Sequence, residues 1–328
     1  MQLDPSSIFT VTTAEDFEKL SLKVFQFQIR KNPVYQSYCA YLGVKVEAIK
    51  TLDDIPYLPI QFFKTKKVVS GEGTDQEAVF SSSGTTGSVT SKHYVHDLKL
   101  YETSYQKAFA HFYGSIEDYC VLALLPSYLE REGSSLIYMV NDLIKKSEHP
   151  KSGFYLNNLN DLKHMLADLE SSHTKTLLIG VSFALLNLIE NMGLSLKHTV
   201  VMETGGMKGR RREMIRSELH GILKKGFGVS EIHSEYGMTE LLSQAYSKGN
   251  GKFYCPPWMK VSTRDTEDPL SNQALGKTGG INIVDLANIN SCAFIATQDL
   301  GKAYEDGSFE VLGRFDNADI RGCNLMVL

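Results

Sequence analysis

A loop of glycines and small hydroxyl residues is the most distinctive chemical feature of this 328-residue sequence. Residues 81–88 read Ser-Ser-Ser-Gly-Thr-Thr-Gly-Ser and directly follow a short strand pattern over 77–80. Glycines let a backbone turn its N–H groups toward an anion, and hydroxyls add neutral donors, so the loop suits a polyphosphate. It is not a Walker-A loop, because Val89 stands five residues after Gly84, where that motif has a glycine. A flexible surface loop is the alternative interpretation.

Three later segments carry groups that suit the rest of a nucleotide. In Tyr-Gly-Met-Thr-Glu (236–240), the glycine allows close backbone approach to a flat ligand, Thr239 offers a phosphate contact, and Glu240 offers a hard oxygen for Mg²⁺. Asp299 ends a Thr-Gln-Asp segment at the end of a predicted strand, where a carboxylate can accept two ribose hydroxyls. A Gly-Arg-Phe-Asp segment (313–316) and Ile-Arg-Gly-Cys (320–323) follow. Each segment alone is a weak signal.

Alternating strand and helix patterns predict the scaffold for these loops. Between residues 119 and 223, apolar runs of strand length alternate with segments of helical period, which favours βαβ units around a parallel sheet. After about residue 250 the pattern changes to short runs separated by turn residues, which predicts a small antiparallel region. The predicted strands are 119–125, 176–179, 200–203, 280–284, 293–297 and 309–312, and the predicted helices are 135–144, 183–189 and 213–223.

The N-terminal region predicts one helix over residues 12–30. Thr12 and Glu15 form a capping-box pattern, apolar residues repeat at helical spacing, and Pro33 stops the helix. We see no internal repeat or low-complexity linker. The chain is therefore expected to form a single domain (1–328), with an α/β part at 1–250 and a β-rich part at 251–328.

Composition excludes several classes of protein. The 34 basic and 38 acidic residues leave a net charge of −4, so nucleic acid is not an expected partner. The N-terminus has no signal-peptide pattern, and the longest apolar run without charge, 176–189, is too short to span a membrane. Five widely spaced cysteines without a CxxC pair argue against a disulfide framework or a zinc site. The expected location is the cytoplasm.

Taken in order, the four motifs resemble those of the adenylate-forming superfamily, which includes acyl-CoA synthetases, adenylation domains and luciferases. That superfamily has a Ser/Thr/Gly phosphate loop, then Tyr-Gly-x-Thr-Glu, Thr-x-Asp, Gly-Arg-x-Asp and Arg-Gly. The resemblance covers roughly residues 60–328. The segment Glu-Thr-Gly-Gly at 203–206 is similar to the glycine pair that lies beside the adenine.

The resemblance implies an enzyme that uses ATP and Mg²⁺, and it implies a role for each of the site residues. The loop would hold the β- and γ-phosphates, Thr239 the α-phosphate, Glu240 the Mg²⁺, Asp299 the ribose, and Arg314 the ribose or phosphate side. The loop residues are Ser82, Ser83, Gly84, Thr85, Thr86 and Gly87, and the adenine would be walled by Gly205, Gly206, Tyr236 and Gly237.

Segments of this sequence resemble two branches of the superfamily in further detail. The form Ser-Ser-Gly-Thr-Thr-Gly, with Thr90 where many members have lysine, resembles the phenylacetate-CoA ligase branch. The segment Leu-Leu-Pro-Ser-Tyr-Leu-Glu-Arg (124–131), followed by Ser-Ser-Leu, resembles the acyl-protein synthetase (LuxE-type) branch. In that branch an acyl adenylate forms, and the acyl group passes to a cysteine near the C-terminus. Cys323 occupies such a position.

The expected function is therefore activation of a carboxylic acid, a fatty acid above all, followed by thioester formation on Cys323 and delivery to a partner reductase. An acyl- or aryl-CoA ligase is the first alternative, and a nucleotide-binding module without turnover is the second. Superfamily members usually continue past this point into a mobile C-terminal domain that supplies a lysine. The sequence stops six residues after Gly322, so that domain is expected to be absent.

Overall fold

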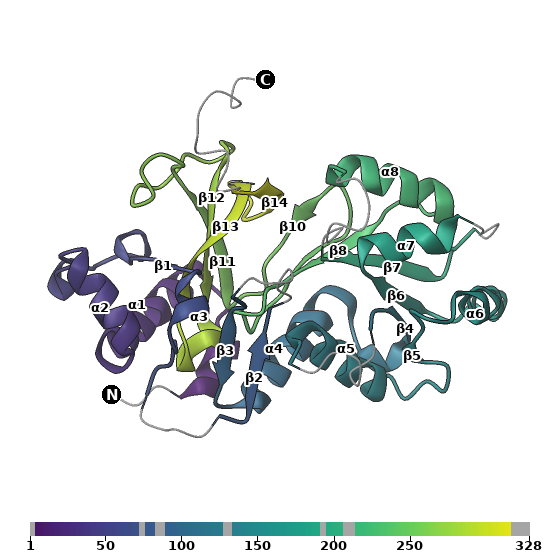
Figure 1. Cartoon of the computed structure of the whole chain (residues 1–328), viewed down its shortest axis with the longest axis horizontal. Coiled ribbons are helices and arrows are strands. Elements are labelled where there is room, and N and C mark those ends of the chain that lie inside the picture. The colour runs from purple at the N-terminus through teal and green to yellow at the C-terminus, as the bar shows by residue number, and fades with distance from the viewer. Residues whose placement is uncertain are drawn as a thin grey trace.

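The computed structural model describes residues 4–71, 76–82, 89–126, 133–190, 195–205 and 214–315. Two six-stranded sheets dominate these ranges, and Figure 1 shows them side by side with helices around each. No helix among the described residues is both long and apolar enough to cross a membrane.

The first sheet is mainly parallel, as the alternating pattern predicted. Its strand order is β5-β4-β6-β7-β8-β9, with β5 to β8 parallel and β9 antiparallel to β8. Strands β4 and β6 are buried along their whole length, which explains why they are continuous apolar runs in the sequence. The strands are Cys120–Leu124 (β4), Gly153–Phe154 (β5), Thr176–Gly180 (β6), Thr199–Thr204 (β7), His233–Tyr236 (β8) and Ala245–Ser247 (β9).

Helices cover both faces of this sheet: α7 and α8 lie on one face and α5 on the other (Figure 1). The three helices predicted here are confirmed, whereas α4 and α6 were not predicted. Side-chain caps begin two of the helices, since Asp97 accepts from the Leu100 N–H and Ser134 from the Ile137 N–H. The helices are Leu98–Tyr113 (α4), Ser135–Lys146 (α5), Leu159–Ser171 (α6), Ser182–Ile189 (α7) and Arg216–Phe227 (α8), with a 3-10 turn at Ile116–Asp118.

The second sheet is antiparallel and confirms the predicted change of pattern after residue 250. Its order is β10-β14-β13-β12-β11, and β1 adds to β13 in parallel. Thr297–Asp299 was expected at the end of a strand, which is wrong. The ladder with β14 continues beyond Asp299 to Ala303, so these residues lie inside β13. The strands are Leu58–Pro59 (β1), Lys252–Phe253 (β10), Met259–Arg264 (β11), Gly279–Asp285 (β12), Phe294–Ala303 (β13) and Phe309–Arg314 (β14).

The N-terminal helices pack on this second sheet, although all of its strands except β1 are more than 200 residues away in sequence. The buried Gln28 of α1 (Ala14–Lys31) donates to the carbonyls of Asn288 and Ile289 at 3.0 and 2.9 Å and accepts from the Ala293 N–H. These partners lie in and beside the 3-10 turn Leu286–Asn290. The second N-terminal helix is Pro33–Tyr41 (α2). Three 3-10 turns lie in the same region, at Pro5–Thr10, Val46–Ala48 and Leu52–Asp54.

The predicted N-terminal cap of α1 is off by one residue. Thr13, not Thr12, is the N-cap, and its hydroxyl oxygen accepts from the Asp16 N–H at 3.1 Å. Thr13 is extended, as an N-cap requires, so the helix starts at Ala14. Pro33 does end α1, but it also begins α2, since proline suits the first position of a helix.

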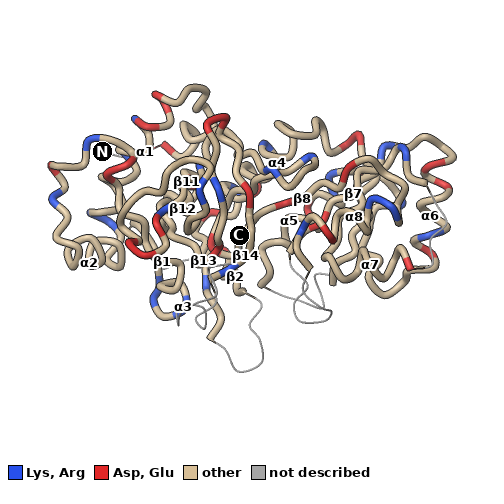
Figure 2. Tube along the Cα trace, turned by 90° about the horizontal axis from the view of Figure 1, so that it is seen from above, with Lys and Arg blue, Asp and Glu red and all other residues tan. Residues whose placement is uncertain are grey.

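A short hairpin lies between the two sheets. It consists of β2 (Ala78–Ser81) and β3 (Lys92–Val95), and it is preceded by the one-turn helix α3 (Phe62–Thr65). In Figure 2, seen from above, β2 and β14 both project onto the middle of the molecule, while Figure 1 shows that they lie at different heights. The predicted phosphate loop connects the two strands of this hairpin.

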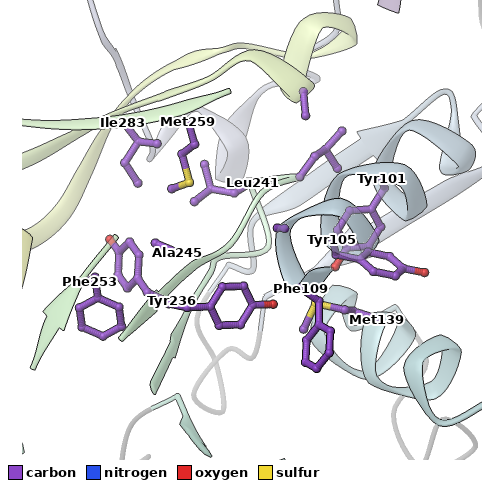
Figure 3. Close-up of a cluster of buried hydrophobic side chains, with 14 of the residues drawn as sticks. Tyr101, Tyr105, Phe109, Met139, Tyr236, Leu241, Ala245, Phe253, Met259 and Ile283 are labelled. Atoms are coloured by element: carbon purple, nitrogen blue, oxygen red, sulfur yellow. The ribbon is translucent and has the colours of Figure 1, made fainter. Parts of the chain in front are cut away.

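One hydrophobic core joins the two sheets. Figure 3 shows aromatic residues of α4 facing a group from β8–β12 across the junction. The aromatic–aromatic contacts are close, with the Tyr101 and Tyr105 ring centroids 4.9 Å apart and those of Tyr236 and Phe253 5.8 Å apart. The junction between the sheets is therefore a packed interior. The division of the chain at residue 250 stays a prediction.

Candidate functional site at the junction of the two sheets

The carboxyl ends of β7 and β8 form the floor of the candidate site. Thr204 and Glu235 pair in register there, at the edge of a parallel sheet where ligands bind in α/β folds. Gly205 follows β7 with φ +71°, an exposed left-handed conformation that favours glycine. An added Cβ would find only Val181 Cγ1, at 4.0 Å, so backbone conformation rather than crowding accounts for glycine here.

Glu203, on β7, is a buried carboxylate with several partners. Its Oε1 lies 3.2 Å from Nε of Arg216 and 3.7 Å from Nε2 of His220. Ser234 donates to the same oxygen at 3.4 Å, and Ser182 donates to Oε2 at 3.3 Å. Burial alone would raise the pKa of Glu203, but the hydrogen bond with His220 and the charge of Arg216 bring that pKa below its ordinary value. Glu203 is therefore an ionised anchor for β7, β8 and α8.

Glu235, the neighbouring buried carboxyl on β8, has a different environment. The Thr204 hydroxyl donates to its Oε2 at 2.5 Å. Burial raises the pKa of Glu235 to about 7, the hydrogen bond from Thr204 opposes that rise, and the charge of Glu203 adds to it. Glu235 therefore titrates near neutral pH.

Three predicted site residues from both sheets meet at Asp299. The Tyr236 hydroxyl donates to Oδ2 of Asp299 at 2.9 Å, and Nε of Arg314 lies 3.2 Å from Oδ1. Asp299 and Arg314 are register partners on β13 and β14. Burial raises the pKa of Asp299, against the lowering effect of the Arg314 charge. The Asp299 side chain is only 10% exposed whereas that of Arg314 is 70% exposed, so a recessed carboxylate lies beneath an accessible cation.

Thr239 and Glu240 are fixed by contacts from the hairpin and the second sheet. The Thr239 carbonyl is 2.9 Å from Nδ1 of the buried His93, and the Glu240 carbonyl accepts from Asn288 at 2.7 Å. Burial lowers the pKa of His93 to about 4, so the ring is neutral and can donate one hydrogen bond to that carbonyl. The segment 239–240 is thus held by hydrogen bonds to its backbone carbonyls, and these two bonds do not involve the Thr239 side chain.

Glu240 is the predicted Mg²⁺ ligand. Its side chain is buried, which raises its pKa, while a hydrogen bond from Ser91 and the charges of Arg314 and Lys64 oppose the rise. No group of three or more His, Cys, Asp or Glu side chains in the described ranges is arranged to hold a metal ion. A single carboxylate still fits Mg²⁺, because this ion commonly binds one or two carboxylates together with substrate phosphates and water.

Of the six loop residues predicted to contact phosphate, 82–87, the structure describes Ser82. It pairs with Ser91 across the hairpin: the Ser91 N–H donates to Ser82 Oγ at 2.9 Å, and the Ser82 N–H donates to the Ser91 carbonyl at 3.1 Å. These bonds close the base of the loop. Seven predicted site residues lie outside the described residues: Ser83, Gly84, Thr85, Thr86, Gly87, Gly206 and Cys323.

The described cysteines behave as packing residues. Burial raises the pKa of Cys39 and of Cys120 to about 11 and that of Cys292 to about 12, and it also raises the pKa of Cys255. A thiol with a raised pKa supplies little thiolate at neutral pH. None of these four therefore has the character of a nucleophile.

Lys64 and His93 were not predicted as site residues. Phe63, next to Lys64 on α3, packs edge-on against the His93 ring with centroids 5.7 Å apart. This contact between α3 and β3 positions Lys64, whose charge lowers the pKa of Glu240. His93 contacts the Thr239 carbonyl although the two residues are 146 positions apart in sequence. No local spacing signals either contact. Glu235 could have been identified as a candidate, because an acidic residue inside a buried strand is unusual.

No protein-family model matches the chain. Two curated relatives are similar along most of it, and both are described as long-chain-fatty-acid–luciferin-component ligases. The relative from Aliivibrio fischeri is 24% identical over 336 aligned residues, with 94% of this chain and 86% of the relative covered. The relative from Vibrio harveyi is 22% identical, with 92% and 84% covered.

Solved structures of adenylate-forming enzymes share the fold. A 2-hydroxyisobutyryl-CoA ligase in complex with 2-HIB-AMP and CoA superposes with a TM-score of 0.67 at 14% identity, with 97% of this chain and 73% of that chain covered. ATP-bound MatB from Rhodopseudomonas palustris gives a TM-score of 0.55 at 17% identity. The match covers 75% of this chain and 49% of MatB, so the chain spans about half the length of that enzyme.

Proposed function

The chain belongs to the LuxE-type long-chain-fatty-acid–luciferin-component ligase family of the adenylate-forming superfamily, and we propose that it activates a fatty or other carboxylic acid with ATP and passes the acyl group to Cys323. In the first step a carboxylate oxygen attacks the α-phosphorus of ATP, the bond to the β-phosphate breaks, and pyrophosphate leaves. In the second step the Cys323 thiolate attacks the acyl carbon, the bond to AMP breaks, and a thioester forms. The thiol proton goes to solvent.

The observation that carries this proposal is the cluster of Tyr236, Asp299 and Arg314. A recessed carboxylate can accept both ribose hydroxyls, and the tyrosine and arginine fix its two oxygens in place. The accessible guanidinium of Arg314 lies where it can neutralise the phosphate side of the same nucleotide. Three motifs distant in sequence thus supply complementary parts of one nucleotide site.

The phosphates would lie between the hairpin and the segment 239–240. Thr239 would contact the α-phosphate, and Glu240 would hold Mg²⁺, which would supply positive charge to neutralise the phosphates. The loop Ser82–Gly87 would hold the β- and γ-phosphates. Lys64 adds a cation on the same side, since its charge reaches Glu240. The main task of such residues is to hold two anions together, which requires charge neutralisation and positioning.

The adenine would lie over the ends of β7 and β8. Gly205 and Gly237 present backbone without side chains, which allows a flat base to approach, and the Tyr236 ring would form a wall beside it. Gly206, which lies outside the described residues, is proposed to belong to the same wall. Because Tyr236 also donates to Asp299, one side chain connects the base region with the ribose region. An acyl-accepting reductase is the partner proposed for the thioester.

Carboxylate-dependent exchange of pyrophosphate into ATP tests the first step. We expect Asp299→Asn to lower kcat/KM for ATP about 100-fold, the range for a lost hydrogen bond to a charged group. Asp118→Asn, an exposed aspartate near Lys175, is the matched control and should leave exchange unchanged. ATP binding without exchange for any acid would instead indicate a nucleotide-binding module.

Labelling with radioactive fatty acid and ATP tests the second step. We expect a hydroxylamine-labile label on the protein that is lost in Cys323→Ala and kept in Cys255→Ser, the matched control. A label that survives Cys323→Ala would rule out this cysteine as the acceptor. Release of the acyl group only upon addition of CoA would identify an acyl-CoA ligase.

A further inference from the structure

A second polar cluster lies at the end of β8, beside the proposed nucleotide site. Thr204, Glu235 and Gln244 form it, and Gly237 lies between the last two. Tyr236 pairs with Ala245 in the β8–β9 ladder, so Gln244 stands across from Gly237. None of these side chains has a task in the binding of phosphate or ribose.

Gln244 carries a buried acceptor that lacks a donor. The side chain is 3% exposed, and its Oε1 has no hydrogen-bond partner within the part of the chain that the structure describes. A buried polar atom without a partner costs free energy, and native proteins rarely keep one without a reason. The second acceptor, the Glu235 carboxyl, receives one hydrogen bond from Thr204.

Gly237 places no side chain against the Glu235 carboxyl. A Cβ at position 237 would lie 2.5 Å from Glu235 Oε1 and 3.3 Å from Gln244 Cγ, so any side chain would displace both residues. Gly237 itself is exposed. The two acceptors therefore flank one point at the carboxyl edge of the parallel sheet, where a bound ligand is expected.

We infer that Thr204, Glu235 and Gln244 form a subsite that accepts hydrogen bonds from an N–H or O–H group of the ligand that binds over Gly237. Thr204 is the positioning residue, and Glu235 and Gln244 are the acceptors. This inference rests on the proposed function, because that function supplies the ligands. The donor is either the amino group of the purine or a hydroxyl or amino substituent on the acid.

A plain aliphatic chain is a poor occupant of this subsite. It would cover both acceptors without supplying a donor, and their desolvation would oppose binding. A ligand with a donor satisfies Gln244 Oε1 and shares the Glu235 carboxyl with Thr204. The cluster therefore acts on selectivity rather than on the chemical step.

Pyrophosphate exchange with matched ligand pairs tests this subsite in the full-length protein. Gln244→Met keeps the side-chain length and removes the acceptor, and Glu235→Gln replaces an acceptor oxygen by a donor. Gln273→Met, on the connection between β11 and β12, is the matched control. Acids of equal chain length with and without a hydroxyl or amino substituent form one pair, and ATP and purine riboside triphosphate, whose base has no N–H donor, form the other.

We expect Gln244→Met to lower kcat/KM about 10-fold for the donor-bearing member of one pair and to leave the other member unchanged. A loss confined to substituted acids places the donor on the acid, and a loss confined to ATP places it on the base. Equal effects on all ligands, or unchanged selectivity in both variants, would overturn the inference. Absence of exchange by the wild-type protein with every acid would refute the proposed function instead.

Discussion

Glu203 and Glu235 lie near the ends of adjacent strands and are both buried, yet their chemistry differs. Glu203 meets an arginine, a histidine and two serines, and its pKa falls below the ordinary value. Glu235 meets one threonine, and burial raises its pKa to about 7. The difference teaches that burial alone does not decide the charge of a carboxyl, because its partners do. One glutamate anchors the sheet, and the other is available to a ligand.

The strongest test of this contrast removes the arginine that pairs with Glu203. Arg216→Met keeps an unbranched side chain beside the Phe253 ring and removes the guanidinium, whose carbon lies 4.8 Å from the ring centroid. We expect a loss of about 3 kcal/mol in the free energy of unfolding by urea, because a buried carboxylate is left without its cation. The double variant with Glu203→Gln should recover most of that loss. A loss below about 1 kcal/mol in Arg216→Met would contradict the assigned role of the pair.

The two glutamates are expected to change the stability in opposite directions as the pH rises. The folded-state pKa of Glu235 is raised from 4.5 to about 7, so its contribution is complete below pH 4.5 and is lost as pH rises through 7. That contribution is about 3 kcal/mol, from 1.36 kcal/mol per pKa unit. Glu203, with a lowered pKa, contributes above pH 4.5 and loses that contribution as the pH falls.

Urea unfolding at pH 5 and pH 8 measures this difference. Glu235→Gln should remove the decline between the two values and be more stable than the wild type at pH 8. Glu203→Gln should be less stable than the wild type at pH 8, because Arg216 and His220 lose their carboxylate. The same slope in Glu235→Gln and in the wild type would refute the titration of Glu235 in this range.

The smallest expected effect on stability comes from removing one hydroxyl donor from each glutamate. Thr204→Val removes the hydroxyl that bonds Glu235, and we expect a loss of about 1–2 kcal/mol. Ser182→Ala removes one of several donors to Glu203, and its hydrogen is shared with the Gly205 carbonyl at 2.9 Å, so a loss below about 1 kcal/mol is expected. Equal losses in the two variants, by thermal or urea unfolding, would show that the number of partners does not matter here.

Much of the scaffold could be predicted, since it follows from local pattern. Strands β4 and β6 are buried on both faces and therefore read as unbroken apolar runs, and the change to short runs after residue 250 marks the antiparallel sheet. Helix α6 was missed because only three leucines form its buried face, and α4 because its buried face also contains Ser104 and Ala108, which weaken the apolar pattern. The Thr12 cap failed by one residue, since Thr12, Thr13, Glu15 and Asp16 offer two overlapping capping patterns.

The sequence by itself determined which chemical groups are present and in what order: hydroxyl and glycine loops, a Tyr-Gly-Met-Thr-Glu segment, Asp299 and Arg314. Only the tertiary structure decided which of them meet. The β-ladder across β13 and β14 brings Arg314 to Asp299, the packing of the two sheets brings Tyr236 to the same carboxylate, and α3 carries Lys64 toward Glu240. These contacts join residues far apart in the chain, and their energies depend on burial and partners that no local window contains. For the same reason Glu203 and Glu235, alike in sequence, differ in charge.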